Sequence, residues 1–489
     1  MATTSTRRFL RDTALSFVSL GMSTFVHFLL RIFLARYMGP ADLGLYTLSY
    51  TAYSFGVLLS AFGIGGAVAK YAAESGDDTT RKGRLLLIGA VSSFFIGCLM
   101  GLLLHFSAEL IAQRFFHMPD MRGLLQIVAL SFPFLALEKA TLGFLNGVRR
   151  MTLFAFVNVF QSVLTLLLTI ALVLMGYGLK GAVAGLVLPI VAMSLFSLLA
   201  TRRDLSRPMR GQSLPILRML VWFGIFAAMG NSMYTLFYNI DKIFLGRYMD
   251  DAAVGIYGTA SLLSNLVPLI PSAVQVITGP AIARYWGRAE YGNIQDLVNR
   301  TMKYTAMLIV PISFVGIVLS RDLIVLFFGE EYVLATVPLQ VLLAGFAFTG
   351  IFTSVATALS MTNWVQMGFI VGAVQVVGNI ALCTLLIPRF GMNGASAAIT
   401  ASHALGCLIN LYLMQRFIKI RIDWRWFACF MAIGALVVAG GLGLKLVVHQ
   451  YLCAFLGLAI LAFITIRYFV TGEDREVIKK LVSFKREPS

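Results

Sequence analysis

The sequence predicts an all-α polytopic membrane protein with fourteen transmembrane helices, arranged as two six-helix pseudo-twofold lobes plus two C-terminal helices. Composition is the first reason: 59% of the 489 residues are hydrophobic and only 12% are charged, whereas about a quarter of a soluble domain is charged. A series of apolar segments long enough to cross a bilayer is the second reason, and an internal repeat is the third. These observations exclude a soluble domain, a disordered chain and a β-barrel.

Fourteen apolar segments follow one another, joined by connections too short to hold a separate soluble domain. They cover residues 14–34, 42–67, 85–105, 123–145, 152–175, 181–200, 216–239, 253–278, 304–326, 336–360, 366–387, 395–415, 426–447 and 450–470. Most Lys and Arg residues fall in the two tails and in alternate connections, which the positive-inside rule assigns to the cytoplasm. We therefore expect a multi-pass protein of the cytoplasmic (plasma) membrane with both termini in the cytoplasm.

The net charge of +17 and the five cysteines have ordinary explanations in such a protein. Cytoplasmic connections that obey the positive-inside rule account for the charge, so we expect no nucleic-acid partner. The cysteines lie in apolar segments without metal-ligand spacing, so we expect no disulfide and no metal site. Because the sequence has no phosphate-binding Gly-Lys-Ser/Thr loop, we expect no cofactor and no direct use of ATP.

Three collinear matches, separated by 211–213 residues, indicate an internal duplication. They pair Ile32–Met38 with Ile243–Met249, Ser107–Ile111 with Ser320–Ile324, and Gly178–Ala184 with Gly391–Ala397. Each copy holds six predicted helices, an even number, so both copies have the same orientation and an axis along the membrane normal relates them. We expect an N-terminal lobe at residues 1–210, a C-terminal lobe at 211–420, and two extra helices with a basic tail at 421–489. Two such lobes can rock about the cleft between them, which gives alternating access.

Polar side chains recur at equivalent positions of the two copies, although contact with lipid requires none. They predict a polar, partly cationic cavity, because polar and ionisable groups within a span usually face the bundle interior or water. The candidate cavity residues are Thr24, His27, Arg31, Asn158, Gln161, Asn231, Thr235, Tyr238, Lys242, Gln375 and Asn379. Hydrogen bonds between helices, and snorkelling of the two cations to the outer headgroups, are the alternatives. We expect substitution of Arg31 or Lys242 by Ala to impair transport while leaving folding intact.

Three other charged residues are candidates for ion coupling or for neutralising a charge. Glu138 and Lys139 are adjacent within the fourth predicted span, and consecutive helical residues point about 100° apart, so they need not form a salt bridge. Glu138 is a candidate carrier of a coupling H⁺ or Na⁺, with a structural pairing as the alternative. Asp241 stands beside Lys242 and offers a charge that neutralises it. Prolines at 268, 271 and 280 predict a bend in the eighth span.

The chain resembles the polysaccharide (oligosaccharide-lipid) flippases at Leu34–Tyr46, at the Asp241–Lys242 helix and at the two Gly-x-x-Gly-Ala-x-Ala turns. These flippases are the O-antigen and teichoic-acid export branch of the multidrug/oligosaccharidyl-lipid/polysaccharide exporter superfamily. The resemblance covers essentially the whole chain. It implies a transporter rather than an enzyme, with a cationic central cavity that moves a polyprenyl-(pyro)phosphate-linked glycan to the outer leaflet for cell-surface polysaccharide biosynthesis. Coupling to H⁺ or Na⁺ and contact with glycan-assembly proteins stay open.

Two other classes of function are weighed against this one. A cation-coupled multidrug exporter of the same superfamily needs an acidic cavity for cationic drugs, whereas the candidate cavity is basic. A membrane-embedded glycosyltransferase or glycan polymerase needs an acidic outer motif or a long outer loop, and neither is evident. An anionic cargo is therefore favoured over both alternatives.

Overall fold

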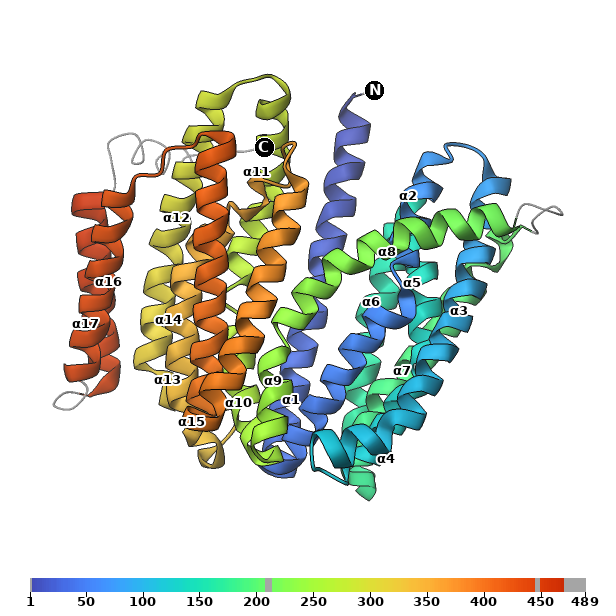
Figure 1. Ribbon diagram of the computed structural model, residues 1–489, viewed down its shortest axis with the longest axis horizontal. Coiled ribbons are helices and arrows are strands. Elements are labelled where there is room, and N and C mark those ends of the chain that lie inside the picture. The colour runs from blue at the N-terminus through green and yellow to red at the C-terminus, as the bar shows by residue number, and fades with distance from the viewer. Residues whose placement is uncertain (1, 207–212, 445–448, 470–489) are drawn as a thin grey trace, which may run out of the picture. The chain divides into compact units, whose positions relative to one another are not determined.

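The computed structural model describes residues 2–206, 213–444 and 449–469, and every regular element in these residues is a helix (Figure 1). The helices form two compact units, Met1–Gly258 and Thr259–Ser489. In the described residues, eight helices are long and apolar enough to cross a membrane, and there are nine spans if one bent pair is counted as a single span. The all-helical architecture of a multi-pass membrane protein, predicted from composition, is thus confirmed for this part of the chain.

The count of fourteen spans stays a prediction, because several predicted spans are joined or interrupted. Two continuous apolar helical segments, Met151–Asp204 and Gln366–Ile418, each contain two predicted spans. Gly178 and Gly391 lie between those pairs and adopt positive φ angles of 53° and 56°. Glycine reaches this backbone region without steric cost. Both residues are the first glycine of the repeated Gly-x-x-Gly-Ala motif, so the motif marks the same turn in both copies.

The first unit begins with a helical hairpin. Helix α1 (Ala2–Ala61) is divided at Gly39, whose φ of 84° and ψ of 178° are not helical. Pro40 follows this glycine. The remaining elements are α2 (Ile64–Glu74), α3 (Thr79–Glu109), η1 (Leu110–Phe115), α4 (Met121–Ala129), α5 (Phe132–Gly147), α6 (Met151–Leu172), η2 (Val173–Tyr177), α7 (Gly178–Thr201), η3 (Arg202–Asp204), α8 (Ser213–Phe237), α9 (Ile240–Tyr248) and α10 (Asp251–Ser264). Helix α5 packs against α2, α3 and α7, while α6 packs against α1 and α7.

Helix α8 runs across α2 and α3 and packs against both (Figure 1). Its Gly224 crosses Gly63 so closely that a Cβ on either residue would collide with backbone of the other segment. The backbone conformation of Gly63, which lies between α1 and α2, also favours glycine, because its φ is 65°. The helix ends at Phe237 and α9 begins at Ile240, so the seventh predicted span, 216–239, is followed by a further short helix.

The second helix of the α1 hairpin crosses α10 at residues that are equivalent in the two copies. A Cβ on Gly44 would collide with the carbonyl oxygen of Asp251, and a Cβ on Gly255 would collide with that of Pro40. The sequence repeat aligns Gly44 with Gly255 and Pro40 with Asp251. The contact is therefore reciprocal, as expected where a twofold axis passes between equivalent helices.

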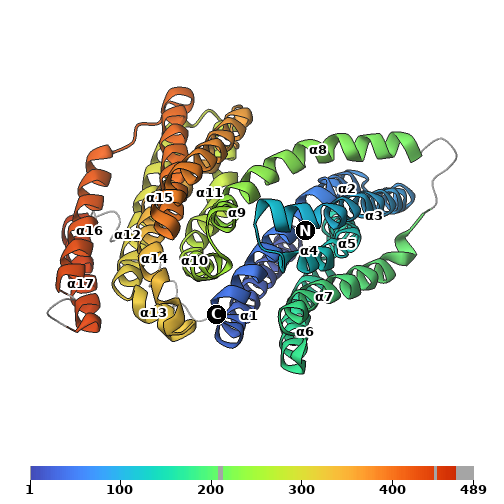
Figure 2. The same cartoon turned by 60° about the horizontal axis from the view of Figure 1, so that its bottom comes forward.

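The second unit continues from α10 with a break at the predicted place. Helices α10 and α11 (Leu269–Gly287) are bent by 44°, and Pro268 and Pro271 stand at this bend. The other elements are α12 (Tyr291–Val318), α13 (Ser320–Phe327), η4 (Glu330–Ala335), α14 (Thr336–Thr353), η5 (Ala356–Ala358), α15 (Val365–Leu413), η6 (Met414–Ile418), α16 (Trp424–Leu444), α17 (Gln450–Ile464) and η7 (Thr465–Phe469). Helices α16 and α17 lie side by side and both pack against α12 (Figure 2). The predicted bend in the eighth span is confirmed.

Candidate functional site

Arg31 lies half-buried in the first helix of the α1 hairpin, facing the second helix. Its Nη1 donates a hydrogen bond to Thr47 Oγ1 at 3.3 Å. Its guanidinium lies 5.0 Å from the ring centroid of Tyr50 and 5.9 Å from that of Tyr46. In the described part of the chain no carboxylate forms an ion pair with it. A cation inside a helical hairpin is thus stabilised by a hydroxyl and two aromatic faces, and its positive charge is not neutralised.

The other predicted residues of this helix extend the same region. The His27 ring is half-buried and meets the Tyr50 ring edge to face, with centroids 6.3 Å apart. Thr24, about one turn before His27 on the same helix, is exposed. Tyr50 therefore contacts both predicted residues, although the sequence did not select it. Recurrence could have found Tyr46, which matches Tyr257 in the repeat, but not Tyr50, which is replaced by Ser261.

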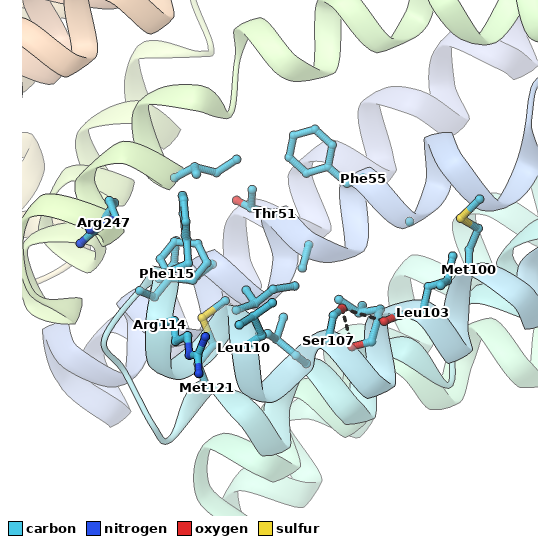
Figure 3. A pocket seen from close by; sticks show the side chains of 18 of the residues that line it. Thr51, Phe55, Met100, Leu103, Ser107, Leu110, Arg114, Phe115, Met121 and Arg247 are labelled. Carbon is cyan, nitrogen blue, oxygen red and sulfur yellow. Dashed lines mark hydrogen bonds between the residues drawn. The ribbon is translucent and has the colours of Figure 1, made fainter.

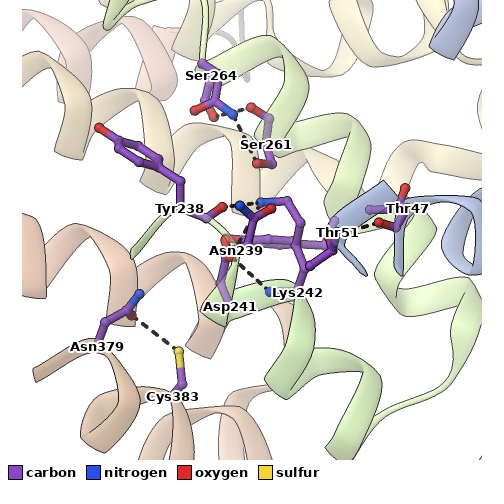
Figure 4. Close-up of polar contacts among 12 residues, drawn as sticks. Thr47, Thr51, Tyr238, Asn239, Asp241, Lys242, Ser261, Ser264, Asn379 and Cys383 are labelled. Carbon is purple, nitrogen blue, oxygen red and sulfur yellow. Dashed lines mark hydrogen bonds and ion pairs between the residues drawn. The ribbon is translucent and has the colours of Figure 1, made fainter. Parts of the chain in front are cut away.

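Lys242 occupies the position equivalent to Arg31 but has a different environment (Figure 4). Its Nζ donates to the carbonyl oxygen of Tyr238 at 2.8 Å and lies 3.4 Å from Asp241 Oδ1. Asp241 Oδ2 accepts a second hydrogen bond, 2.6 Å long, from the Tyr257 hydroxyl. Only 8% of Lys242 and none of Asp241 is exposed. This cation is therefore neutralised inside the protein.

The break between α8 and α9 explains where this ion pair forms. Tyr238 and Asn239 interrupt the helix, and backbone groups released inside a membrane need replacement partners. The Lys242 ammonium supplies one for the Tyr238 carbonyl, while the backbone N–H of Lys242 donates to Asp241 Oδ1 at 2.9 Å. The sequence offered Asp241 as a neutralising charge, and the structure places its carboxylate against Lys242.

The Arg31 and Lys242 environments meet at the second helix of the hairpin. Thr47, which accepts from Arg31, packs against Gly258, where a Cβ would lie 3.3 Å from its Oγ1. Gly258 directly follows Tyr257, the donor to Asp241. Both groups lie inside Met1–Gly258, so one compact unit holds a cation without a carboxylate partner next to a closed ion pair. We call the region of His27, Arg31, Thr47 and Tyr50 the Arg31 site.

The remaining predicted residues of the first unit lie on α6 and α8. Asn158 Nδ2 donates to the carbonyl of Phe154 in its own helix, and Gln161 is half-buried one turn further along α6. Thr235 is half-buried, and its carbonyl accepts from Asn239. Asn231 belongs to α8, but its side chain lies outside the described residues.

In the second unit, the two predicted amides lie within α15. Gln375 Nε2 is 3.5 Å from the carbonyl oxygen of His403, on the far side of the turn at Gly391. Asn379 is fully buried, and its Oδ1 accepts from Cys383 Sγ at 3.4 Å (Figure 4). Gln375 thus bridges the two halves of α15, which is the helix-to-helix hydrogen bond that the sequence left as an alternative.

Glu138 is buried in α5, with 2% of its surface exposed. Its Oε2 has no hydrogen-bond partner among the described residues, and Lys139 forms no ion pair with it there. An isolated ionised carboxylate is costly to bury, whereas the protonated acid is far less so. No group of three His, Cys, Asp or Glu residues in the described ranges has the geometry of a metal site.

Comparison with known proteins identifies the family to which this chain belongs. Residues 33–337, more than half of the chain, match the family described as polysaccharide biosynthesis protein. The probable flippase AglR of Haloferax volcanii is 24% identical over 412 residues, which cover 84% of each chain. The probable low-salt glycan biosynthesis flippase Agl15 of the same organism is 21% identical over 253 residues, 50% of this chain and 53% of that one. The chain therefore spans about half the length of this second relative.

A solved structure shows the same fold at low sequence identity. The lipid II flippase MurJ, in an inward closed conformation, aligns with a TM-score of 0.74 and 17% identity, covering 94% of this chain and all of that one. Both curated relatives are named as flippases rather than enzymes, which supports the prediction of a transporter. The resemblance to the oligosaccharide-lipid flippases is confirmed: the chain belongs to the polysaccharide biosynthesis protein family.

Proposed function

We propose that this protein flips a polyprenyl-(pyro)phosphate-linked oligosaccharide across the cytoplasmic membrane by alternating access, for cell-surface polysaccharide biosynthesis. The carrying observation is Arg31, a half-buried arginine in the α1 hairpin that no described carboxylate neutralises. Family membership supports flipping of a lipid-linked glycan as the class of activity.

The chemistry of the Arg31 site suits an anionic headgroup. A sugar-pyrophosphate carries several donors and acceptors and about two negative charges, for which hydrocarbon offers no partner. The planar guanidinium of Arg31 has five donors that match phosphate oxygens in pairs. Within the described residues it makes one hydrogen bond, to the side chain of Thr47. The remaining donors are then able to bind phosphate, while His27 and Tyr50 provide polar and aromatic contacts beside it.

Lys242 receives a different role in this proposal. Its ammonium already binds Asp241 and the Tyr238 carbonyl, so contact with phosphate would require breaking a buried ion pair. We propose that Lys242, Asp241 and Tyr257 stabilise the break between α8 and α9, and that Arg31 binds the cargo. The expectation that Lys242→Ala leaves folding intact is revised accordingly.

Glu138 is the proposed coupling group. The buried Oε2 without a hydrogen-bond partner supports a carboxyl that is protonated in this conformation, because protonation removes the cost of burying its charge. Release of this proton in another conformation would couple H⁺ movement to transport. Na⁺ is the alternative ion.

The topology is part of the same proposal. We propose fourteen spans, with both termini in the cytoplasm and lobes at residues 1–210 and 211–420, followed by two extra helices at 421–489. The reciprocal contact of Gly44 and Gly255 supports a twofold relation between the two copies. Proteins that assemble the glycan are proposed as partners because they handle the same lipid-linked cargo.

Reconstitution tests the proposed function and separates it from drug export. Liposomes containing the purified protein and a fluorescent polyprenyl-diphosphate oligosaccharide are treated with a membrane-impermeant quencher. We expect the protein to make the inner-leaflet label accessible, whereas protein-free liposomes protect about half of it. Transport of the cationic dye ethidium without movement of the glycolipid would contradict the proposal and favour a multidrug exporter.

A further inference from the structure

The Met1–Gly258 unit contains an apolar chamber of about 800 Å³ (Figure 3). Its walls come from the second helix of α1, from α3 and η1, from the starts of α4 and α5, and from α9. Thr51 and Phe55 line one side, while Met100 and Leu103 line another. The α1 residues of this wall lie on the face of the helix opposite to Tyr46 and Tyr50, so the chamber is separate from the Arg31 site.

Two arginines, Arg114 and Arg247, line the chamber toward one end, away from Met100 (Figure 3). The Arg247 Nη1 lies 3.2 Å from His117 Nδ1, and its guanidinium lies 6.0 Å from the Phe115 centroid. Neither arginine forms an ion pair with a carboxylate in the described ranges. The neighbouring Arg122, which does not line the chamber, lies 3.4 Å from Glu109. The chamber therefore combines apolar walls with two cations that lack an acidic partner.

The wall of the chamber continues into the outer surface of α3 and η1. Leu103 and Leu110 both line the chamber, and yet 55% and 54% of their surfaces are exposed. Phe106, between them on the chain, is 79% exposed. In a membrane protein such an apolar surface faces acyl chains. A lipid chain can then pass from the bilayer into the chamber without crossing a polar barrier.

We propose that the chamber is a binding site for an anionic phospholipid of the bilayer, with one acyl chain between α1 and α3 and its phosphate at Arg114 and Arg247. Arginine binds phosphate oxygens in pairs, and two cations without acids favour a lipid with net negative charge over a zwitterionic one. Continuity with the lipid-facing surface of α3 admits a lipid chain. Thr51 and Ser107 are the only uncharged polar side chains of the described lining, too few to replace the water around an oligosaccharide, which favours a phospholipid over the glycan-linked cargo. The site acts independently of the proposed function.

Lipid binding to the purified full-length protein tests this proposal. After delipidation, native mass spectrometry measures separately the retention of dioleoyl phosphatidylglycerol, of dioleoyl phosphatidylcholine and of undecaprenyl phosphate. We expect preferential binding of phosphatidylglycerol, weakened at least tenfold in the Arg114→Gln/Arg247→Gln double variant. Arg122→Gln is the matched control and should bind within about twofold of wild type. Ala52→Trp narrows the chamber without changing either arginine, and it should also weaken binding.

Four results would overturn the proposal. Equal retention of both lipids would remove the role of the two cations, and an equal loss in Arg122→Gln would indicate unspecific surface charge. Unchanged binding in both Ala52→Trp and the double variant would place the lipid elsewhere. Retention of undecaprenyl phosphate with no retention of phosphatidylglycerol would assign the chamber to the isoprenoid carrier. Because these measurements use no transport assay, their failure leaves the proposed flipping activity untouched.

Discussion

Arg31 and Lys242 occupy equivalent positions in the two copies of the repeat, but they are stabilised in different ways. Arg31 is half-buried and contacts a hydroxyl and two aromatic rings. Lys242 is buried against Asp241. The decisive difference lies one residue earlier on each helix, where the first copy has Leu30 and the second has Asp241. After duplication, one cation can therefore stay available to a ligand while its equivalent stabilises a break in its own helix.

The tyrosines of the two copies follow the same division. Tyr46 and Tyr257 are equivalent and both are almost fully buried. The Tyr257 hydroxyl donates a hydrogen bond to the carboxylate of Asp241, whereas the Tyr46 ring lies beside the Arg31 guanidinium. The second copy uses its tyrosine to satisfy an acid that the first copy lacks. Substitutions at equivalent positions should thus have unequal effects, which the following predictions use.

The largest effect on stability is expected from Lys242→Ala. This change leaves the Asp241 carboxylate buried without its cation, which costs about 3–5 kcal/mol of unfolding free energy. Thermal unfolding in detergent measures the loss. The Asp241→Asn/Lys242→Ala double variant removes the stranded charge and should recover most of the stability. A single variant as stable as wild type would show that the ion pair does not hold the α8–α9 break.

The next largest difference is expected between Tyr257→Phe and Tyr46→Phe. The first substitution removes a hydrogen bond to a buried carboxylate, worth about 1.5–3 kcal/mol. The second keeps the ring beside Arg31 and should cost less than about 1 kcal/mol. Thermal unfolding of both variants under the same conditions checks the difference. Equal losses would mean that the equivalent tyrosines carry the same role after all.

Gly44→Ala and Gly255→Ala should instead have similar effects, because their contacts are reciprocal. Either methyl group must push the second α1 helix away from α10, and such overpacking costs about 1–3 kcal/mol. Gly66→Ala is the matched control, since a Cβ there meets no atom within 4 Å. Unfolding curves that show a loss for one crossing glycine and none for the other would argue against a twofold relation at this crossing.

The smallest effect on stability is expected from Arg31→Gln. The side chain is half-buried, and a cation–π contact at a partly exposed site contributes about 0.5–1 kcal/mol. The melting temperature should therefore stay near that of wild type. A loss as large as that of Lys242→Ala would show that Arg31 is a structural residue.

Sequence periodicity predicted the parts of the fold that carry their own local signals. The turns at Gly178 and Gly391 follow from a repeated glycine motif, and the bend near Pro268 follows from proline chemistry. The seventh predicted span, 216–239, ends where Tyr238 and Asn239 break the helix, but the sequence did not predict how this break is stabilised, because neither residue is Gly or Pro. Its stabilising group is an ion pair completed by Tyr257, which comes from another helix.

The candidate site was predicted only in part for the same reason. Arg31 and His27 share a helix face that spacing alone reveals, and both lie beside Tyr50. Recurrence between copies could not select Tyr50, since its equivalent is Ser261. Gln375 does recur, but its amide bridges two parts of α15. Periodicity identifies a polar face, and tertiary packing decides whether that face meets a neighbouring helix or a ligand.

Initial rates of glycolipid flipping in proteoliposomes test the division between the two cations most directly. The comparison uses Arg31→Gln, the Asp241→Asn/Lys242→Gln double variant and, as a control, Arg36→Gln on an exposed part of the same hairpin, each at an equal amount of folded protein. Loss of a charge-assisted contact with phosphate, about 1.5–3 kcal/mol, predicts that Arg31→Gln flips at least about tenfold more slowly. The other two variants should stay within about twofold of wild type. A wild-type rate for Arg31→Gln together with a large loss in the double variant would contradict the account.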